Sequence, residues 1–152
     1  MNSTERYGSL LARGAIAALF IISGVGKLTG LAATSGYIAS KGLPSPTILG
    51  VVAGVLELVA GLALLVGFRA RYAALALTAF LVPVTIIFHN PIGLAGVEAQ
   101  MQVIQVLKNL AIAGGLLAIA TRGAGALSLD GPRPMEQDLR SRSLAGHEVT
   151  ST

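Results

Sequence analysis

Four long runs of apolar residues constrain this chain more than any other feature of its sequence. Each run covers about 20 residues, the length that an α-helix needs to cross the hydrocarbon core of a bilayer. They contain few charged residues and extend over about residues 10–31, 47–68, 71–89 and 97–121. The sequence therefore predicts an all-α fold, an integral membrane bundle of four transmembrane helices.

The composition also indicates that the chain lies in a lipid bilayer. Hydrophobic residues make up 53% of the chain and charged residues only 12%, whereas a soluble domain carries about 25% charged residues. The lipid bilayer is therefore the first expected partner. The chain has no cysteine, which excludes disulfides, thiolate catalysis and cysteine-ligated metals, and no metal site is expected.

Three segments follow from this pattern. Residues 1–9 form an N-terminal cytoplasmic segment, and residues 10–129 form the four-helix transmembrane domain. Residues 130–152 contain Pro132, Pro134 and mixed charges, with few large apolar side chains. This composition predicts a mobile cytoplasmic tail.

The basic residues predict the orientation of the bundle. With four spans, both termini and the middle loop lie on one side of the membrane. That side carries eight arginines, and the other carries two lysines, Lys27 and Lys41. The arginines are Arg6, Arg13, Arg69, Arg71, Arg122, Arg133, Arg140 and Arg142. Because basic residues are retained on the cytoplasmic side, both termini are expected there, and the positive charge requires no nucleic-acid partner.

One short stretch resembles a nucleotide-binding loop. Residues 21–30 read IISGVGKLTG, and a Walker-type loop reads G-x-x-x-x-G-K-[ST]. The position of its first glycine is occupied by Ile21, and Leu28 replaces the hydroxyl residue that follows the lysine. No strand precedes the loop, so phosphate binding is not expected and Lys27 is placed at the outer end of the first span.

Polar residues inside the spans follow helical spacing. The first span has one stripe, formed by Arg13, Ala17, Phe20, Gly24 and Lys27. The second has a stripe of small residues that includes Glu57, formed by Gly50, Gly54, Glu57 and Gly61. Residues spaced by three and four lie on one face of a helix, and small residues let a second helix approach closely. We therefore expect both stripes to face other helices.

Depth in the membrane suggests which polar groups meet. At 1.5 Å per residue, Glu57 and Lys108 lie roughly 15 Å and 16 Å below the outer ends of their spans. A charge at this depth is costly unless it is paired or hydrated. We predict a buried polar site with ligand-binding or proton-handling candidates Glu57, Lys108, Asn109, Gln105, Lys27 and His89.

A structural role competes with a functional one at each position. A Glu57–Lys108 pair would also serve only to specify helix packing. Lys27 would then be an anchor that extends to the headgroups, His89 an interfacial residue and Asn109 a hydrogen-bonding link between helices. Arg13 is expected to be a membrane anchor, or to form an ion pair with Glu57.

The chain resembles the DoxX family of small four-span bacterial membrane proteins. The resemblance rests on Arg13, the segment 20–28, Gly42-Leu43-Pro44, residues 57–67, His89 and residues 105–115 with 125–130. It implies a multi-pass protein of the bacterial inner (plasma) membrane. Name-giving members belong to quinone-linked thiosulfate oxidation, and relatives are tied to membrane redox or oxidative-stress complexes.

Three functions remain open at this level. The first is a small membrane subunit of a quinone-linked redox or oxidative-stress complex, with a membrane-associated oxidoreductase as partner and quinone as ligand. The second is a small-molecule transporter or export factor that uses Lys27 and Lys108. The third is a structural or assembly subunit without a ligand. The chain shows no cofactor ligands of its own, so autonomous enzyme activity is not expected, and homo-oligomerisation is left open.

Overall fold

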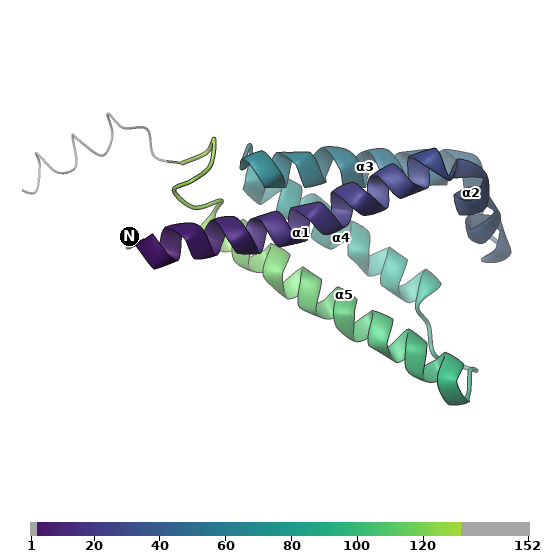
Figure 1. The fold of residues 1–152 in the computed structure, drawn as a ribbon. Coiled ribbons are helices and arrows are strands. Elements are labelled where there is room, and N and C mark those ends of the chain that lie inside the picture. Colours follow the sequence, from purple (N-terminus) through teal and green to yellow (C-terminus); the bar gives the residue numbers. More distant parts are fainter. Residues whose placement is uncertain (1–2, 132–152) are drawn as a thin grey trace, which may run out of the picture.

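The computed structural model describes residues 3–131 as five helices joined by short connections (Figure 1). The helices are α1 (Ser3–Thr29), α2 (Leu31–Ser40), α3 (Pro46–Val66), α4 (Ala70–Phe88) and α5 (Gly96–Arg122). No strand occurs within residues 3–131. The predicted all-α fold is confirmed.

Four of these helices are long and apolar enough to cross a membrane, and they lie over the four predicted spans. The fifth, α2, lies between the first two predicted spans, where no helix was predicted. It has 10 residues and packs on α3. Its Ile38 is buried, and Leu31, Thr34 and Ile38 cover Gly50 of α3. Most of the predicted tail, residues 132–152, lies outside the described residues.

The four long helices form two antiparallel pairs, α1 with α3 and α4 with α5. The pairs meet near the N-terminus of α1 and spread apart toward the α4–α5 connection (Figure 1). The start of α1, the α3–α4 turn and the end of α5 therefore lie at one end of the bundle. Among the described residues, α3 and α5 do not pack against each other.

Glycines set the close approach of α1 and α3. A Cβ added at Gly24 would lie 2.7 Å from the carbonyl oxygen of Gly54 and 2.8 Å from the amide nitrogen of Leu58. A Cβ added at Gly61 would lie 3.0 Å from the Ile21 side chain. The two backbones therefore touch, as small residues permit at helix interfaces in lipid. The predicted stripes account for the buried faces: Arg13, Ala17, Phe20 and Gly24 on α1, and Gly50, Gly54, Glu57 and Gly61 on α3.

The apolar core lies at the end where the two helix pairs meet. Phe20, Leu64, Leu77 and Leu116 are fully buried there, together with alanines of α1 and α4. Other large apolar side chains, such as Ile22 and Leu110, point outward. In water such a surface would be unfavourable, whereas in a bilayer it faces hydrocarbon.

Arg13 lies buried at this end of the bundle and ties α1 to the segment that follows α5. Its side chain is only 2% exposed, and it donates hydrogen bonds to the carbonyl oxygens of Ala124 and, at 2.7 Å, of Leu127. The residue is therefore neither a membrane anchor that reaches the headgroups nor a partner of Glu57. The carbonyls of the segment after α5 hold it instead, a long-range contact that helical spacing alone does not reveal.

The segment after α5 also caps α4. The two carboxylate oxygens of Asp130 accept hydrogen bonds, each at 2.9 Å, from the amides of Arg69 and Ala70. These amides begin α4 and have no partner within the helix. Asp130, which the sequence assigned to a mobile tail, therefore belongs to the folded domain.

Candidate functional site

A buried ion pair joins α1 to α3. The Lys27 ammonium donates a hydrogen bond to the Glu57 carboxylate at 2.7 Å and a second one to the Ser23 hydroxyl at 2.6 Å. The Glu57 side chain is 6% exposed and the Lys27 side chain 30%. Glu57 is thus enclosed, whereas Lys27 remains accessible from one side.

Helical spacing places these groups together. Ser23 and Lys27 are four residues apart on α1 and therefore neighbours on its surface. Glu57 lies on the same face of α3 as Gly54 and Gly61, where α1 approaches most closely. The glycines let the backbones of α1 and α3 approach closely, so that Lys27 on α1 reaches Glu57 on α3. The sequence analysis did not single out Ser23 as a site residue, although its spacing of four residues from Lys27 indicates that the two side chains are neighbours.

The ion pair borders a largely apolar cavity of about 360 Å³ between α2, α3 and α4. Lys27 and Glu57 lie on its wall together with His89, which ends α4. The other lining residues are Thr34, Tyr37, Ile38, Leu43, Leu49, Ala53, Phe80, Pro83, Val84, Ile87 and Phe88. The Tyr37 and Phe88 rings contact each other at 5.3 Å between centroids. The cavity volume is within the range of small-molecule sites, and its few polar groups could orient a ligand.

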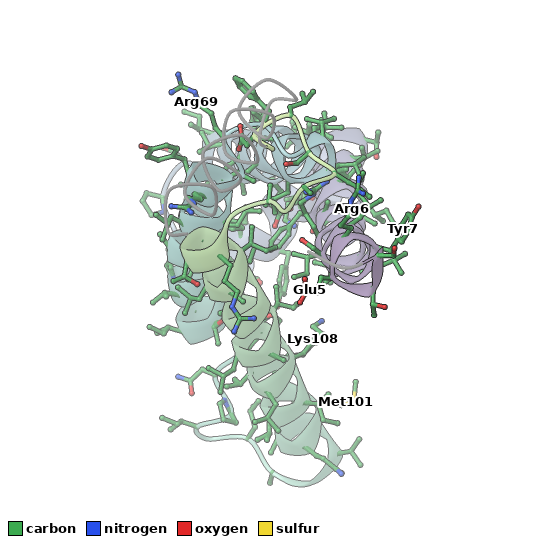
Figure 2. The ribbon with its side chains drawn as sticks, turned by 90° about the vertical axis from the view of Figure 1, so that its left-hand side faces the viewer. Glu5, Arg6, Tyr7, Arg69, Met101 and Lys108 are labelled. Carbon is green, nitrogen blue, oxygen red and sulfur yellow. The ribbon has the colours of Figure 1, made fainter. Side chains whose placement is uncertain are left out.

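Lys108 does not take part in this site. It lies exposed on α5, a helix that does not pack against α3 in the described part of the chain, and it projects outward from α5 (Figure 2). The predicted Glu57–Lys108 pair is therefore wrong: equal depth places two groups at one level but does not place their helices side by side. Gln105 is half-buried on α5 and likewise does not line the cavity.

Asn109 forms a separate link between α4 and α5. Its buried side-chain amide donates a hydrogen bond to the Thr85 hydroxyl at 2.9 Å, and that hydroxyl donates to the Leu81 carbonyl at 2.7 Å. This arrangement agrees with one of the two roles considered for Asn109, that of a hydrogen bond between helices. Asn109 lines a different hollow from the one beside Glu57.

His89 contacts α5 and also borders the cavity beside Lys27 and Glu57. Its Nδ1 lies 3.2 Å from the Gln102 side-chain oxygen on α5, while the residue also lines the cavity beside Lys27 and Glu57. If Nδ1 carries the proton, it donates to Gln102, and Nε2 is then left as an acceptor. Within residues 3–131, no cluster of three or more His, Asp or Glu side chains is placed to hold a metal ion.

The arrangement offers two chemical capabilities. The Lys27 ammonium has three N–H donors, of which Ser23 and Glu57 take two, so one remains for an acceptor in the cavity. The Glu57 carboxylate receives Lys27 at Oε2, and its second oxygen has no hydrogen bond from any residue of the described segment. The pair can therefore donate to a carbonyl and accept a proton at nearly the same place.

Comparisons with known proteins give a consistent result. The family model described as DoxX matches residues 8–90. The inner membrane protein YqjF of Escherichia coli is 38% identical over 130 residues, covering 86% of this chain and 95% of YqjF. The inner membrane protein YphA of the same organism is 35% identical over 121 residues, covering 80% of this chain and 86% of YphA. No solved structure matches the chain significantly.

Proposed function

Because this chain belongs to the DoxX family and is a multi-pass protein of the inner membrane, we propose that it is a small membrane subunit of a quinone-linked redox system. It binds a quinone headgroup in the cavity beside Lys27 and Glu57. The observation that carries the proposal is the buried ion pair on the wall of an otherwise apolar cavity.

The cavity matches the chemistry of a quinone. A quinone headgroup is a flat apolar ring with carbonyl oxygens, and it reaches proteins through the bilayer. The aromatic residues Tyr37, Phe80 and Phe88 provide apolar surface of the right kind. The free N–H of Lys27 supplies a charged donor for one carbonyl, which is stronger than a neutral hydrogen bond. The volume of about 360 Å³ accommodates a small headgroup.

A bound quinone accepts two electrons and two protons. In this proposal Glu57 accepts a proton at its second carboxylate oxygen, and the hydrogen bond from Lys27 to Oε2, which orients the carboxylate, supports that role. His89, on the same cavity wall, offers a further exchangeable proton. The electrons come from a partner oxidoreductase, because none of the side chains that line the cavity can supply the two electrons that reduce a quinone.

The first experiment measures binding directly. Purified protein in detergent micelles is titrated with decylubiquinone by isothermal titration calorimetry. Loss of a charged hydrogen bond costs about 1.5–3 kcal/mol, so Lys27→Met should weaken binding at least about tenfold. Lys108→Met removes the same charge from the exposed face of α5 and should leave the affinity unchanged.

A charge exchange separates binding from packing. The double variant Lys27→Glu, Glu57→Lys retains an ion pair between α1 and α3 but moves the ammonium to the enclosed position. We expect it to recover much of the thermal stability lost by either single change and to remain defective in quinone binding. A wild-type protein that binds no quinone, or an exchange variant that binds as wild type does, would contradict the proposal.

Partner capture extends the test. The wild-type protein and Lys27→Met are purified from native membranes in mild detergent, and their quinone content and associated proteins are compared. We expect an oxidoreductase with both preparations and quinone only with the wild type. If no oxidoreductase accompanies the wild-type protein, a redox subunit is the wrong assignment, even if the cavity binds quinone.

A further inference from the structure

Three arginines surround a second cavity at the end of the bundle where the helix pairs meet. Arg69 and Arg71 come from the start of α4, and Arg122 ends α5. They line a cavity of about 510 Å³ together with residues 123–126, which follow α5. The Arg71 guanidinium lies close to the backbone of Gly123, so this side chain bridges α4 and the end of α5.

No ion pair within the described part of the chain neutralises these three charges. Asp130 also lines the cavity, but its two oxygens already accept hydrogen bonds from the amides of Arg69 and Ala70. Among the described residues that line the cavity, three arginines therefore accompany one carboxylate, whose oxygens bind backbone amides. The resulting excess of positive charge favours an anion.

An apolar groove begins at the same place. It runs between α3 and α4, has a volume of about 750 Å³, and shares Arg69 and Tyr72 with the arginine-lined cavity. Apart from these two residues its lining is wholly apolar, with Val55, Val59 and Ala76 among its members. The Arg69 guanidinium lies 6.0 Å from the centre of the Phe68 ring, which also lines the groove.

We propose that the groove and the arginine-lined cavity together bind one anionic phospholipid of the bilayer. One acyl chain lies in the groove between α3 and α4, and the phosphate lies among Arg69, Arg71 and Arg122. Guanidinium groups bind phosphate oxygens through paired hydrogen bonds, and basic pockets between helices at a membrane surface bind acidic headgroups. The arginines lie at the ends of helices that are long and apolar enough to cross a membrane. The ends of such spans reach the headgroup level, where the polar and apolar parts of a lipid meet.

A lipid explains both features at once. A soluble anion would use the arginines but leave the adjoining groove without a role, and a zwitterionic lipid would fill the groove without compensating the positive charge. The site shares no residue with the cavity beside Lys27 and Glu57. The inference therefore does not depend on quinone binding.

The headgroup is tested by native mass spectrometry. The delipidated protein is titrated with phosphatidylglycerol or with phosphatidylcholine carrying the same acyl chains, and bound lipid is counted. We expect phosphatidylglycerol to bind at least about tenfold more tightly. Each positive charge contributes about fivefold, so Arg71→Gln and Arg122→Gln should each weaken its binding by that factor. Arg6→Gln, which removes an exposed charge from α1 away from Arg69 (Figure 2), should change it less than twofold.

The groove is tested independently of charge. Ala76→Trp fills the groove and should lower phosphatidylglycerol binding severalfold without changing the headgroup preference of the remaining binding. Ala79→Trp places the same bulk on an exposed position of α4 outside the groove and should have no effect. Both positions are exposed, so neither variant is expected to impair folding, and far-UV circular dichroism checks this.

Three results would overturn the inference. The first is equal affinity for the two lipids. The second is an equal loss of binding with Arg6→Gln and with Arg71→Gln, which would indicate general surface charge. The third is displacement of phosphatidylglycerol by millimolar inorganic phosphate, which would make the site one for a soluble anion.

Discussion

The two partners of the buried ion pair should contribute unequally to stability. Lys27→Met leaves the Glu57 carboxylate, whose side chain is only 6% exposed, without its cation. Breaking a buried pair in this way costs about 3–5 kcal/mol. Because Lys27 is 30% exposed, the pair is only partly shielded from solvent. We therefore expect a loss of about 3 kcal/mol in the free energy of unfolding, the lower end of that range.

Removing the other partner should cost less. Glu57→Gln keeps an oxygen acceptor for Lys27, and the accessible lysine can turn toward the membrane surface. We expect a loss of about 1–2 kcal/mol, as for a weakened hydrogen bond to a charged group. The difference between the two variants, about 1–2 kcal/mol, follows from the unequal exposure of the two side chains.

A double-mutant cycle measures both quantities. Unfolding free energies of the wild type, the two single variants and the double variant are determined in mixed micelles by titration with SDS, monitored by far-UV circular dichroism. The coupling energy should exceed about 1 kcal/mol, and Lys108→Met, an exposed control, should lie within about 0.5 kcal/mol of wild type. Equal losses for Lys27→Met and Glu57→Gln would refute the reasoning, as would a loss for Lys27→Met no larger than that for Lys108→Met.

Two further predictions concern the packing of the bundle. Gly24→Ala places a Cβ 2.7 Å from the carbonyl oxygen of Gly54 and should lower the free energy of unfolding by about 1–3 kcal/mol, whereas Gly26→Ala, with no atom within 4 Å, should be neutral or stabilising in the same SDS titration. Asp130→Asn weakens the cap of α4 and should cost about 0.5–2 kcal/mol, measured as a lower thermal midpoint. Unchanged midpoints would show that the cap is dispensable.

The positions of the helices and their buried faces could be predicted from the sequence. Apolar length is a local property, so four spans follow from it without knowledge of the fold. The spacing of Arg13 and Phe20 on α1, and of Gly54 and Gly61 on α3, identified the faces that are buried in the bundle. Residues spaced by three and four share a face of any helix, whatever that face later contacts. The cytoplasmic position of the termini stays a prediction from the arginine distribution.

Which faces meet was decided only by the tertiary structure. Glu57 pairs with Lys27 and not with Lys108, because close backbone packing through Gly24 sets α1, and not α5, beside α3. Depth along a helix axis gives the level of a residue but not the neighbour it faces. The depth estimate therefore favoured Lys108, although Lys27, which the sequence placed at the outer end of its span, is the partner of Glu57.

Two further contacts that the sequence did not predict also depend on the tertiary structure. Arg13 binds carbonyls more than 100 residues away in sequence, and Asp130 caps a helix that begins about 60 residues before it. Local patterns cannot report such contacts, because they depend on how the chain ends converge. A single sequence therefore determines which segments enter the membrane and which sides they bury. Three-dimensional packing determines which charges, cavities and chain ends come together.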